Sequence, residues 1–249
     1  QERALASADV VLSPSLACTS ELREDYPGLH CVTARLGISA SLMTPDVHVE
    51  GEQREEELLL YVGRFSDVKG TREFFRLSAK LLKERPGLHV RCVGGVPANR
   101  KAEGRWRRQW ESMCPEGSAE RISFYPWLAS DALTSHYRQA SLLVIPSWTE
   151  TFGYVALEAM LQGTPIIASA CPGLGELIVA GQTGLLFEVR DERTLYAKVL
   201  QLLDDPALAQ NLGLAAAKRA REHYLWDERV NDYVDVYEAL LAQSMCSNP

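Results

Sequence analysis

Two basic and two acidic residues stand out because their types and places in the chain suit an anionic sugar ligand. Arg64 and Lys69 follow the apolar run 58–62, which is typical of a strand. Glu150 precedes a predicted helix, and Glu158 lies about two turns into that helix. Cations offset phosphate charge, and carboxylates accept hydrogen bonds from hydroxyl pairs on a ribose or a hexose. This combination favours a nucleoside diphosphate linked to a sugar.

The loops that carry these residues have backbone features that also suit phosphate. Predicted helices begin near Gly70 and near Gly153. A helix N-terminus offers unpaired N–H groups and the positive end of a dipole, and glycine lets the backbone approach phosphate oxygens closely. A third loop, Gly94-Gly95-Val96-Pro97, ends another strand, although this Gly-Gly pair is equally consistent with a simple turn.

Strand-like and helix-like patterns alternate along most of the chain and must position these loops. The predicted strands cover residues 58–62, 88–93, 121–125, 141–145, 166–169 and 184–187, and the predicted helices cover 71–85, 105–113, 131–139, 153–162, 174–180, 191–203, 207–224 and 227–242. This alternation predicts an α/β fold with a Rossmann-like parallel sheet and helices on both faces. Such sheets bind ligands beyond the carboxyl ends of their strands, where the loops above lie.

The first part of the chain is predicted to be a separate piece. Residues 1–43 contain two short strand candidates, at 10–12 and 31–34, and a helix candidate at 18–26. Residues 44–57 contain Pro, Gly and five Glu residues, so we interpret them as a linker or hinge.

Composition excludes several classes of protein. The chain has 249 residues and a net charge of −7, which argues against a general nucleic-acid binder. No apolar stretch approaches the roughly 20 residues of a spanning helix, and the N-terminus is a poor signal peptide. The six cysteines and five histidines show no metal-ligand spacing, so we expect reduced thiols, no metal and a cytoplasmic setting.

The segment from Glu150 to Met160, ETFGYVALEAM, resembles the E-x7-E signature of retaining glycosyltransferase family 4, whose members have the GT-B fold. The Gly63-Arg64…Lys69-Gly70 loop is similar to a second mark of that family. Further family-like segments follow in order at 163–169, 173–178 and 181–186, and the resemblance runs from about Leu58 to the C-terminus.

The resemblance implies a role for each matching residue. Arg64 and Lys69 would hold the donor diphosphate, Glu150 would contact the transferred sugar, and Glu158 would bind the ribose. Backbone N–H groups would bind phosphate, and the loop 125–128 would flank the base, although Pro126 stands where the family usually has Gly. The implied catalytic residues are Arg64, Lys69 and Glu150, and the implied donor-binding residues are Gly63, Trp127, Leu128, Phe152, Gly153, Tyr154, Val155 and Glu158.

The implied reaction is transfer of a hexosyl group from a UDP- or GDP-sugar to a sugar, lipid or small-molecule acceptor, with retained configuration and without metal or cofactor. Residues 58–225 would form the donor-binding domain, 226–249 a helix that returns toward the first half, and 1–43 the tail of that half. The chain begins at Gln1, consistent with a fragment or a processed product. We expect the missing half in the same chain or in a partner chain, and the fragment alone to be inactive or weak.

Other interpretations stay open at this point. The chain could be a non-catalytic nucleotide-sugar-binding subunit of a split transferase, or another GT-B enzyme such as a sugar-nucleotide epimerase. The four charged residues could be solvated loop charges and helix-capping acids, and Trp127 and Trp148 could be core residues. The basic segment Arg100 to Arg108 favours an amphipathic surface helix with buried tryptophans, with a peripheral membrane or anionic-acceptor contact as the alternative.

Overall fold

Six parallel strands form the main sheet of the chain in a computed structural model, which describes residues 5, 7–43, 57–96 and 99–246. In chain order they are β3 (Leu58–Arg64), β4 (His89–Gly95), β5 (Ile122–Tyr125), β6 (Leu142–Ile145), β7 (Ile166–Ser169) and β8 (Leu185–Phe187). Their order across the sheet is β5-β4-β3-β6-β7-β8. The chain therefore reverses its direction of travel between β3 and β6, and such a switch point is where open α/β sheets bind ligands.

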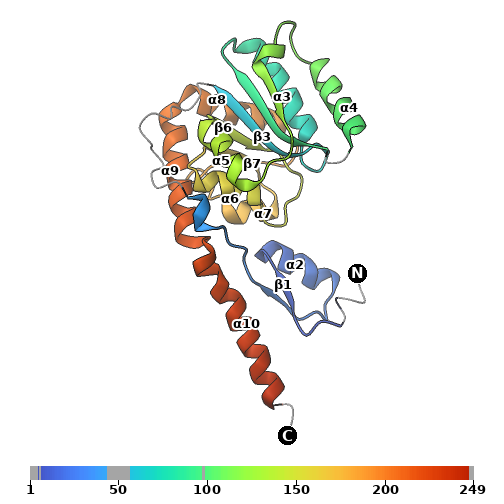
Figure 1. The fold of residues 1–249 in the computed structure, drawn as a ribbon, viewed down its shortest axis with the longest axis vertical. Helices are drawn as coiled ribbons and strands as arrows, with labels where there is room; N and C mark the ends of the chain where they lie inside the picture. Colours follow the sequence, from blue (N-terminus) through green and yellow to red (C-terminus); the bar gives the residue numbers. More distant parts are fainter. Residues whose placement is uncertain (1–4, 6, 44–56, 97–98, 247–249) are drawn as a thin grey trace.

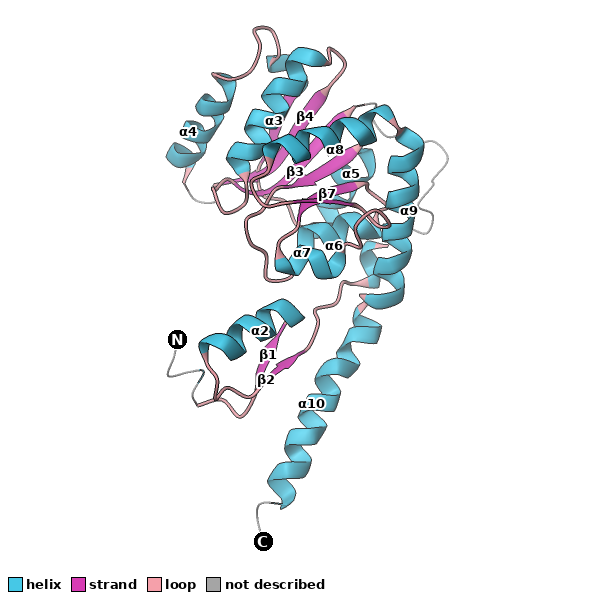
Figure 2. Ribbon diagram, turned by 180° about the vertical axis from the view of Figure 1, so that it is seen from behind, coloured by secondary structure: helices cyan, strands magenta, loops and turns pink. Residues whose placement is uncertain are grey.

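Helices cover both faces of this sheet (Figures 1 and 2). Side chains of α3 (Thr71–Glu84), α4 (Arg100–Glu111) and α8 (Glu192–Asp204) share one apolar core, and those of α5 (Ser130–Gln139), α6 (Tyr154–Leu161) and α7 (Pro172–Leu177) share the other. Helix α9 (Pro206–His223) contributes to both. Strand side chains alternate between the cores, as Leu59 and Leu60 do, which explains the continuous apolar runs. The predicted α/β fold class is confirmed.

The first part of the chain forms a small unit with its own sheet. Strands β1 (Val11–Ser13) and β2 (Cys31–Thr33) pair in parallel, and α2 (Leu16–Asp25) connects them. Residues 34–43, including the short 3-10 helix η1 (Ala40–Leu42), then lead to the main domain. The long helix α10 (Trp226–Cys246) extends past this unit, and the hydroxyl of Tyr233 donates to the carbonyl of Ala34. Residues 44–56 of the predicted linker lie outside the described residues, and the division into domains stays a prediction.

Helices α4 and α7 differ by several residues from the sequence prediction, and α10 continues to Cys246, past its predicted end at residue 242. The helix predicted over 174–180 begins at Pro172 and ends at Leu177. It ends early because the N–H of Val179 donates to the hydroxyl of Thr183 and Ala180 pairs with Gly184. Helix α4 begins at Arg100, well before the predicted start at residue 105, because the side chain of Asn99 caps it by accepting from the N–H of Ala102.

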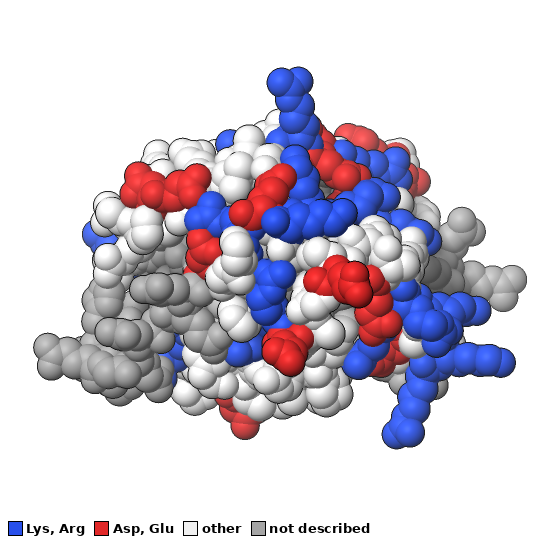
Figure 3. Space-filling model, turned by 90° about the horizontal axis from the view of Figure 1, so that it is seen from above, with Lys and Arg blue, Asp and Glu red and all other residues white. Residues whose placement is uncertain are grey.

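Helix α4 is amphipathic, as predicted. Trp110 is fully buried and stacks on Phe75 with 4.7 Å between ring centroids, and Trp106 packs partly buried against the same core. The exposed face of the helix carries Arg100, Lys101, Arg105 and Arg108. A group of Lys and Arg side chains is seen at the right of Figure 3, the side on which Figure 1 places α4. The cations therefore lie on the solvent side of a helix anchored by its tryptophans.

Candidate functional site

An ion pair crosses the switch point between β3 and β6. The Nζ atom of Lys69, in the loop after β3, lies 2.6 Å from Oε1 of Glu150, in the loop after β6. The hydroxyl of Ser147 donates to the same carboxylate oxygen at 2.9 Å. The two side chains are 27% and 16% exposed, so both groups sit partly shielded at the sheet edge. The structure thus brings together the cation and the carboxylate that the sequence singled out from different loops.

A buried tyrosine organises the loop that carries Arg64 and Lys69. The hydroxyl of Tyr61 lies 3.0 Å from the carbonyl oxygen of Arg64, 3.3 Å from that of Lys69 and 2.9 Å from Oγ1 of Thr71. Burial raises the pKa of Tyr61 far above its ordinary value, so this hydroxyl stays protonated and can donate. Oγ1 of Thr71 in turn accepts from the N–H of Ser66. The backbone of the loop that carries Arg64 and Lys69 is therefore held by the hydroxyl groups of Tyr61 and Thr71.

The loops after β3 and β6 are also joined through their backbones. The N–H of Trp148 donates to the carbonyl oxygen of Val68 at 2.8 Å. Gly70 has φ 64°, and a Cβ atom at this position would lie 1.9 Å from the carbonyl oxygen of Pro146. Only glycine accepts both the left-handed backbone and this approach. This fixed contact keeps Lys69 and Glu150 within reach of each other.

Arg64 and the N-terminus of α6 provide further positive charge at this edge of the sheet. The Arg64 side chain is exposed, and among the described residues no carboxylate lies within ion-pair distance of it. Helix α6 begins after Gly153, and no described side chain caps its first N–H groups. The side chain of Phe152 is buried in the core, whereas the hydroxyl of Tyr154 donates to the carbonyl oxygen of Gly37. The first backbone N–H groups of α6 are therefore without a side-chain cap at this edge of the sheet.

Glu158 lies in the second turn of α6, and its carboxylate is bound by two hydroxyl groups. Its carboxylate accepts from Ser130 at 2.5 Å and from Tyr137 at 2.8 Å, both on α5. Burial, and then the charge of Glu158, raise the pKa of Tyr137 well above its ordinary value, so Tyr137 remains a donor. Because α5 follows the loop 125–129, these bonds bring Glu158 next to the segment predicted to flank the base. Two further acceptor positions of the carboxylate stay open to other donors.

The two tryptophans of the loops differ in their surroundings. Trp127 is 70% exposed, so the alternative that it is a core residue is wrong, and Leu128 beside it packs partly against the core. Trp148 is held from two sides: its Nε1 donates to the buried Glu73, and the guanidinium of Arg190 lies 3.7 Å from its ring centroid. Trp148 therefore has the contacts of a structural residue, which the sequence left open.

Sequence reasoning missed the hydroxyl groups that bind the charged residues of the site, either at the side chain or at the backbone. Ser147, Ser130, Tyr137 and Tyr61 each bind a predicted site residue through a hydroxyl group. A local signal existed for Ser147, which stands three residues before Glu150, and for Tyr61, which stands three residues before Arg64. Ser130 and Tyr137 lie on α5, 28 and 21 residues before Glu158, and only the fold brings them to it.

The described residues contain neither a metal-ligand cluster nor a helix that could span a membrane. Among the described residues no group of three or more His, Cys, Asp and Glu side chains could hold a metal ion. The free thiols include those of Cys18, Cys31, Cys92, Cys114 and Cys171. None of the helices within the described ranges has the length and apolar character needed to cross a membrane.

Comparison with known proteins identifies the family to which this chain belongs. The family profile "Glycosyl transferases group 1" matches residues 45–219, more than half of the chain. The chain belongs to this family of glycosyl transferases.

Individual relatives agree with this assignment. The chain is similar to a D-inositol 3-phosphate glycosyltransferase of Streptomyces avermitilis, with 34% identity over 86% of this chain and 43% of the relative. Its fold is similar to that of the sucrose-phosphate synthase of Thermosynechococcus elongatus, with a TM-score of 0.82, 28% identity, and coverage of 97% of this chain and 61% of that one. Its fold alone is also similar to that of the C-terminal domain of the group 1 glycosyl transferase LpcC of Francisella tularensis, with a TM-score of 0.65, 24% identity, and coverage of 76% of this chain and 99% of that one. The chain thus spans about half the length of the curated relatives it matches.

Proposed function

We propose that this chain is the donor-binding half of a retaining glycosyltransferase, which transfers a hexosyl group from a UDP- or GDP-sugar without a metal ion. The observation that carries the proposal is the Lys69–Glu150 pair at the switch point, at 2.6 Å. A cation suited to phosphate and a carboxylate suited to sugar hydroxyls lie side by side at the edge of the sheet where such folds bind ligands, which supports the proposal. Family membership supports the same class of reaction.

Each part of a nucleotide sugar has a matching group in this arrangement. The diphosphate would lie against Arg64, Lys69 and the uncapped N-terminus of α6. The hexose would meet Glu150, and the ribose would meet the open acceptor positions of Glu158. The exposed ring of Trp127 would offer the base a surface for stacking.

The chemistry proposed for the site is electrostatic. When the bond between the sugar and the diphosphate breaks, negative charge grows on the leaving diphosphate. Fixed cations and N–H dipoles aimed at that charge stabilise the transition state more than the ground state. The Arg64 guanidinium offers five N–H donors. The Lys69 ammonium has three, so it can keep its bond to Glu150 and still bind phosphate.

Calorimetric titration of the chain with UDP- and GDP-hexoses tests the donor site. We expect one-to-one binding of one of the two classes and weaker binding in Arg64→Ala, by about 1.5–3 kcal/mol, the range for hydrogen bonds to charged groups. Exposed Arg105, on α4, provides the matched control Arg105→Ala, which should bind as the unaltered chain does. Absence of binding by the unaltered chain, or equal affinity of the Arg64 variant, contradicts the donor-site assignment.

Retention and metal independence are tested on the full-length enzyme. The anomeric configuration of the product, followed by NMR, should equal that of the donor sugar. Transfer should continue in the presence of a chelator, and strict dependence on added metal contradicts the mechanism. Donor binding without transfer by any longer form would instead favour a non-catalytic sugar-nucleotide-binding subunit.

A further inference from the structure

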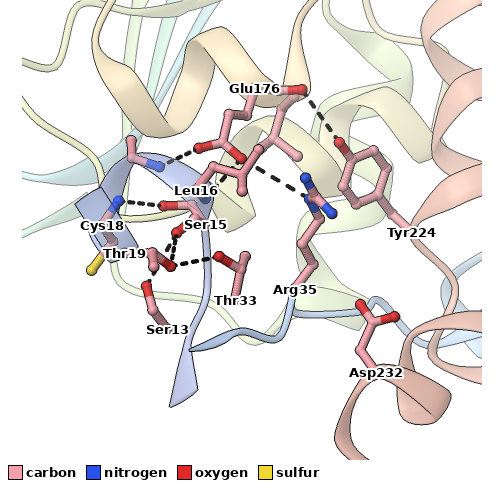
Figure 4. Close-up of polar contacts among 12 residues, drawn as sticks. Ser13, Ser15, Leu16, Cys18, Thr19, Thr33, Arg35, Glu176, Tyr224 and Asp232 are labelled. Atoms are coloured by element: carbon pink, nitrogen blue, oxygen red, sulfur yellow. Dashed lines mark hydrogen bonds and ion pairs between the residues drawn. The ribbon is translucent and has the colours of Figure 1, made fainter. Parts of the chain in front are cut away.

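One carboxylate joins the small N-terminal unit to the main domain. Glu176 of α7 accepts hydrogen bonds from the backbone N–H groups of Leu16, at 3.0 Å, and Ala17, at 2.7 Å (Figure 4). Nε of Arg35 lies 4.0 Å from the same carboxylate. Leu16 and Ala17 are the first two residues of α2, so both oxygens of Glu176 bind one helix N-terminus across a separation of about 160 residues.

This contact completes the capping of α2. The first N–H groups of a helix have no partner inside the helix. The side chain of Ser15 accepts from the N–H of Cys18, and Glu176 takes the two N–H groups before it. A carboxylate at a helix N-terminus is favoured by the dipole and by charge-assisted hydrogen bonds. The contact borders a pocket of about 360 Å³, so polar bonds rather than continuous apolar packing hold the two units together here.

The backbone of Glu176 is itself fixed to the main domain. Arg219 of α9 donates to the carbonyl oxygens of Leu177, at 2.9 Å, and Glu176, at 3.1 Å. The hydroxyl of Tyr224 lies 3.3 Å from the same Glu176 oxygen and donates to it (Figure 4). The side chain of Leu177, the last residue of α7, is buried in the apolar core. Helix α7 is therefore held at its C-terminal end, and its Glu176 side chain reaches outward from a rigid base.

The other end of α7 contacts the candidate donor site. The N–H of Gly173 donates to the carbonyl oxygen of Glu150, and a Cβ atom at Gly173 would lie 2.3 Å from that oxygen. The side chain of Leu174 packs so close to Gly153 that a Cβ atom there would lie 2.8 Å from it. One short helix thus contacts the Glu150 loop and the start of α6 with its first residues, and α2 with Glu176.

We propose that Glu176 is a positioning residue that fixes the N-terminal unit, and the first half of the enzyme to which it belongs, at a set place relative to the Glu150 loop. This role rests on the proposed function, because it matters for transfer only if the first half carries the acceptor. Glu176 acts through α2 rather than on the donor. Its loss should therefore slow transfer and leave nucleotide-sugar affinity unchanged.

The variant Glu176→Gln tests the proposal, because it keeps the size of the side chain and removes its charge and one strong acceptor. Amide hydrogen exchange measured by NMR on the chain reports the contact directly. We expect the Leu16 and Ala17 amides to exchange about tenfold faster or more, as a lost hydrogen bond to a charged group implies, and the Cys18 amide to keep its rate. Ser15→Ala is the matched control: it removes the helix's own cap and should expose Cys18 while Leu16 and Ala17 stay protected.

Kinetics on the full-length enzyme test whether loss of the Glu176 contact slows transfer. In Glu176→Gln we expect kcat to fall about tenfold, with the KM for the nucleotide sugar unchanged, which marks an interaction needed after donor binding. Unchanged exchange at Leu16 and Ala17 overturns the proposal, and so does an equal loss of kcat in Ser15→Ala. If the unaltered chain binds no nucleotide sugar, the proposed function fails, whereas the exchange data still decide whether Glu176 holds α2.

Discussion

Replacing Lys69 by Ala removes the ammonium that the structure places 2.6 Å from Glu150. Two unit charges at that separation attract by roughly 6 kcal/mol at an effective dielectric near 20, before the cost of desolvating them. Desolvation of partly buried groups offsets most of this, and a hydrogen bond to a charged group contributes about 1.5–3 kcal/mol net. We therefore expect Lys69→Ala to raise the Kd for a nucleotide sugar by about 10- to 150-fold. In this variant the Glu150 carboxylate has lost its counter-charge and repels the diphosphate, which raises the Kd further.

Calorimetric titration with UDP- and GDP-hexoses measures this change. Lys83→Ala, which removes an exposed lysine from the last turn of α3, is the control and should leave the Kd unchanged. The double variant Lys69→Ala with Glu150→Gln should lose less affinity than the two single losses added together, because the two side chains form one contact. A Kd for Lys69→Ala equal to that of the unaltered chain, in a variant with an unaltered circular dichroism spectrum, would refute the reasoning.

Three further predictions concern the hydroxyl network, the loop contact and the thiols. Glu158→Gln should weaken binding of UDP or GDP and of the intact nucleotide sugar equally, by about tenfold, because the ribose is common to both; a loss confined to the sugar form contradicts its role. Gly70→Ala should lower the free energy of unfolding in urea by about 2 kcal/mol or more, since its Cβ would meet Pro146; unaltered stability would show that the loop is not fixed there. Burial raises the pKa of Cys114 to about 11, so alkylation followed by mass spectrometry should accelerate up to that pH rather than level off near 9.0.

The alternation of strands and helices could be predicted from sequence because each element leaves a local pattern. The strand at 166–169 has the predicted limits, and the helix predicted from Thr71 ends within one residue of its predicted end. The strand order is not local, because β3 pairs with both β4 and β6, and no periodicity within a strand specifies its neighbours. Helix α7 was predicted too long because the bond from Val179 to Thr183 competes with helical bonds.

The candidate site also has parts that the sequence predicts and parts that depend on the packing of distant elements. Residue types and loop positions indicated Lys69 and Glu150, and the fold rule for parallel sheets indicated that their loops would meet. The bonds from Ser130 and Tyr137 to Glu158 could not be predicted, because they depend on how α5 packs against α6. The same holds for Glu176, whose binding to α2 joins elements about 160 residues apart in the chain.

Mapping of backbone amide shifts by NMR, during titration with the nucleotide sugar that binds, tests the central assignment most directly. The account predicts that the largest shifts fall at Arg64, at Lys69 and at the start of α6, residues 153–155, with smaller shifts near Trp127. All of these lie at the carboxyl edge of the six-stranded sheet. Shifts that leave these residues unaltered and fall instead around the pocket beside Glu176, or on α4, would contradict the assignment of the donor site.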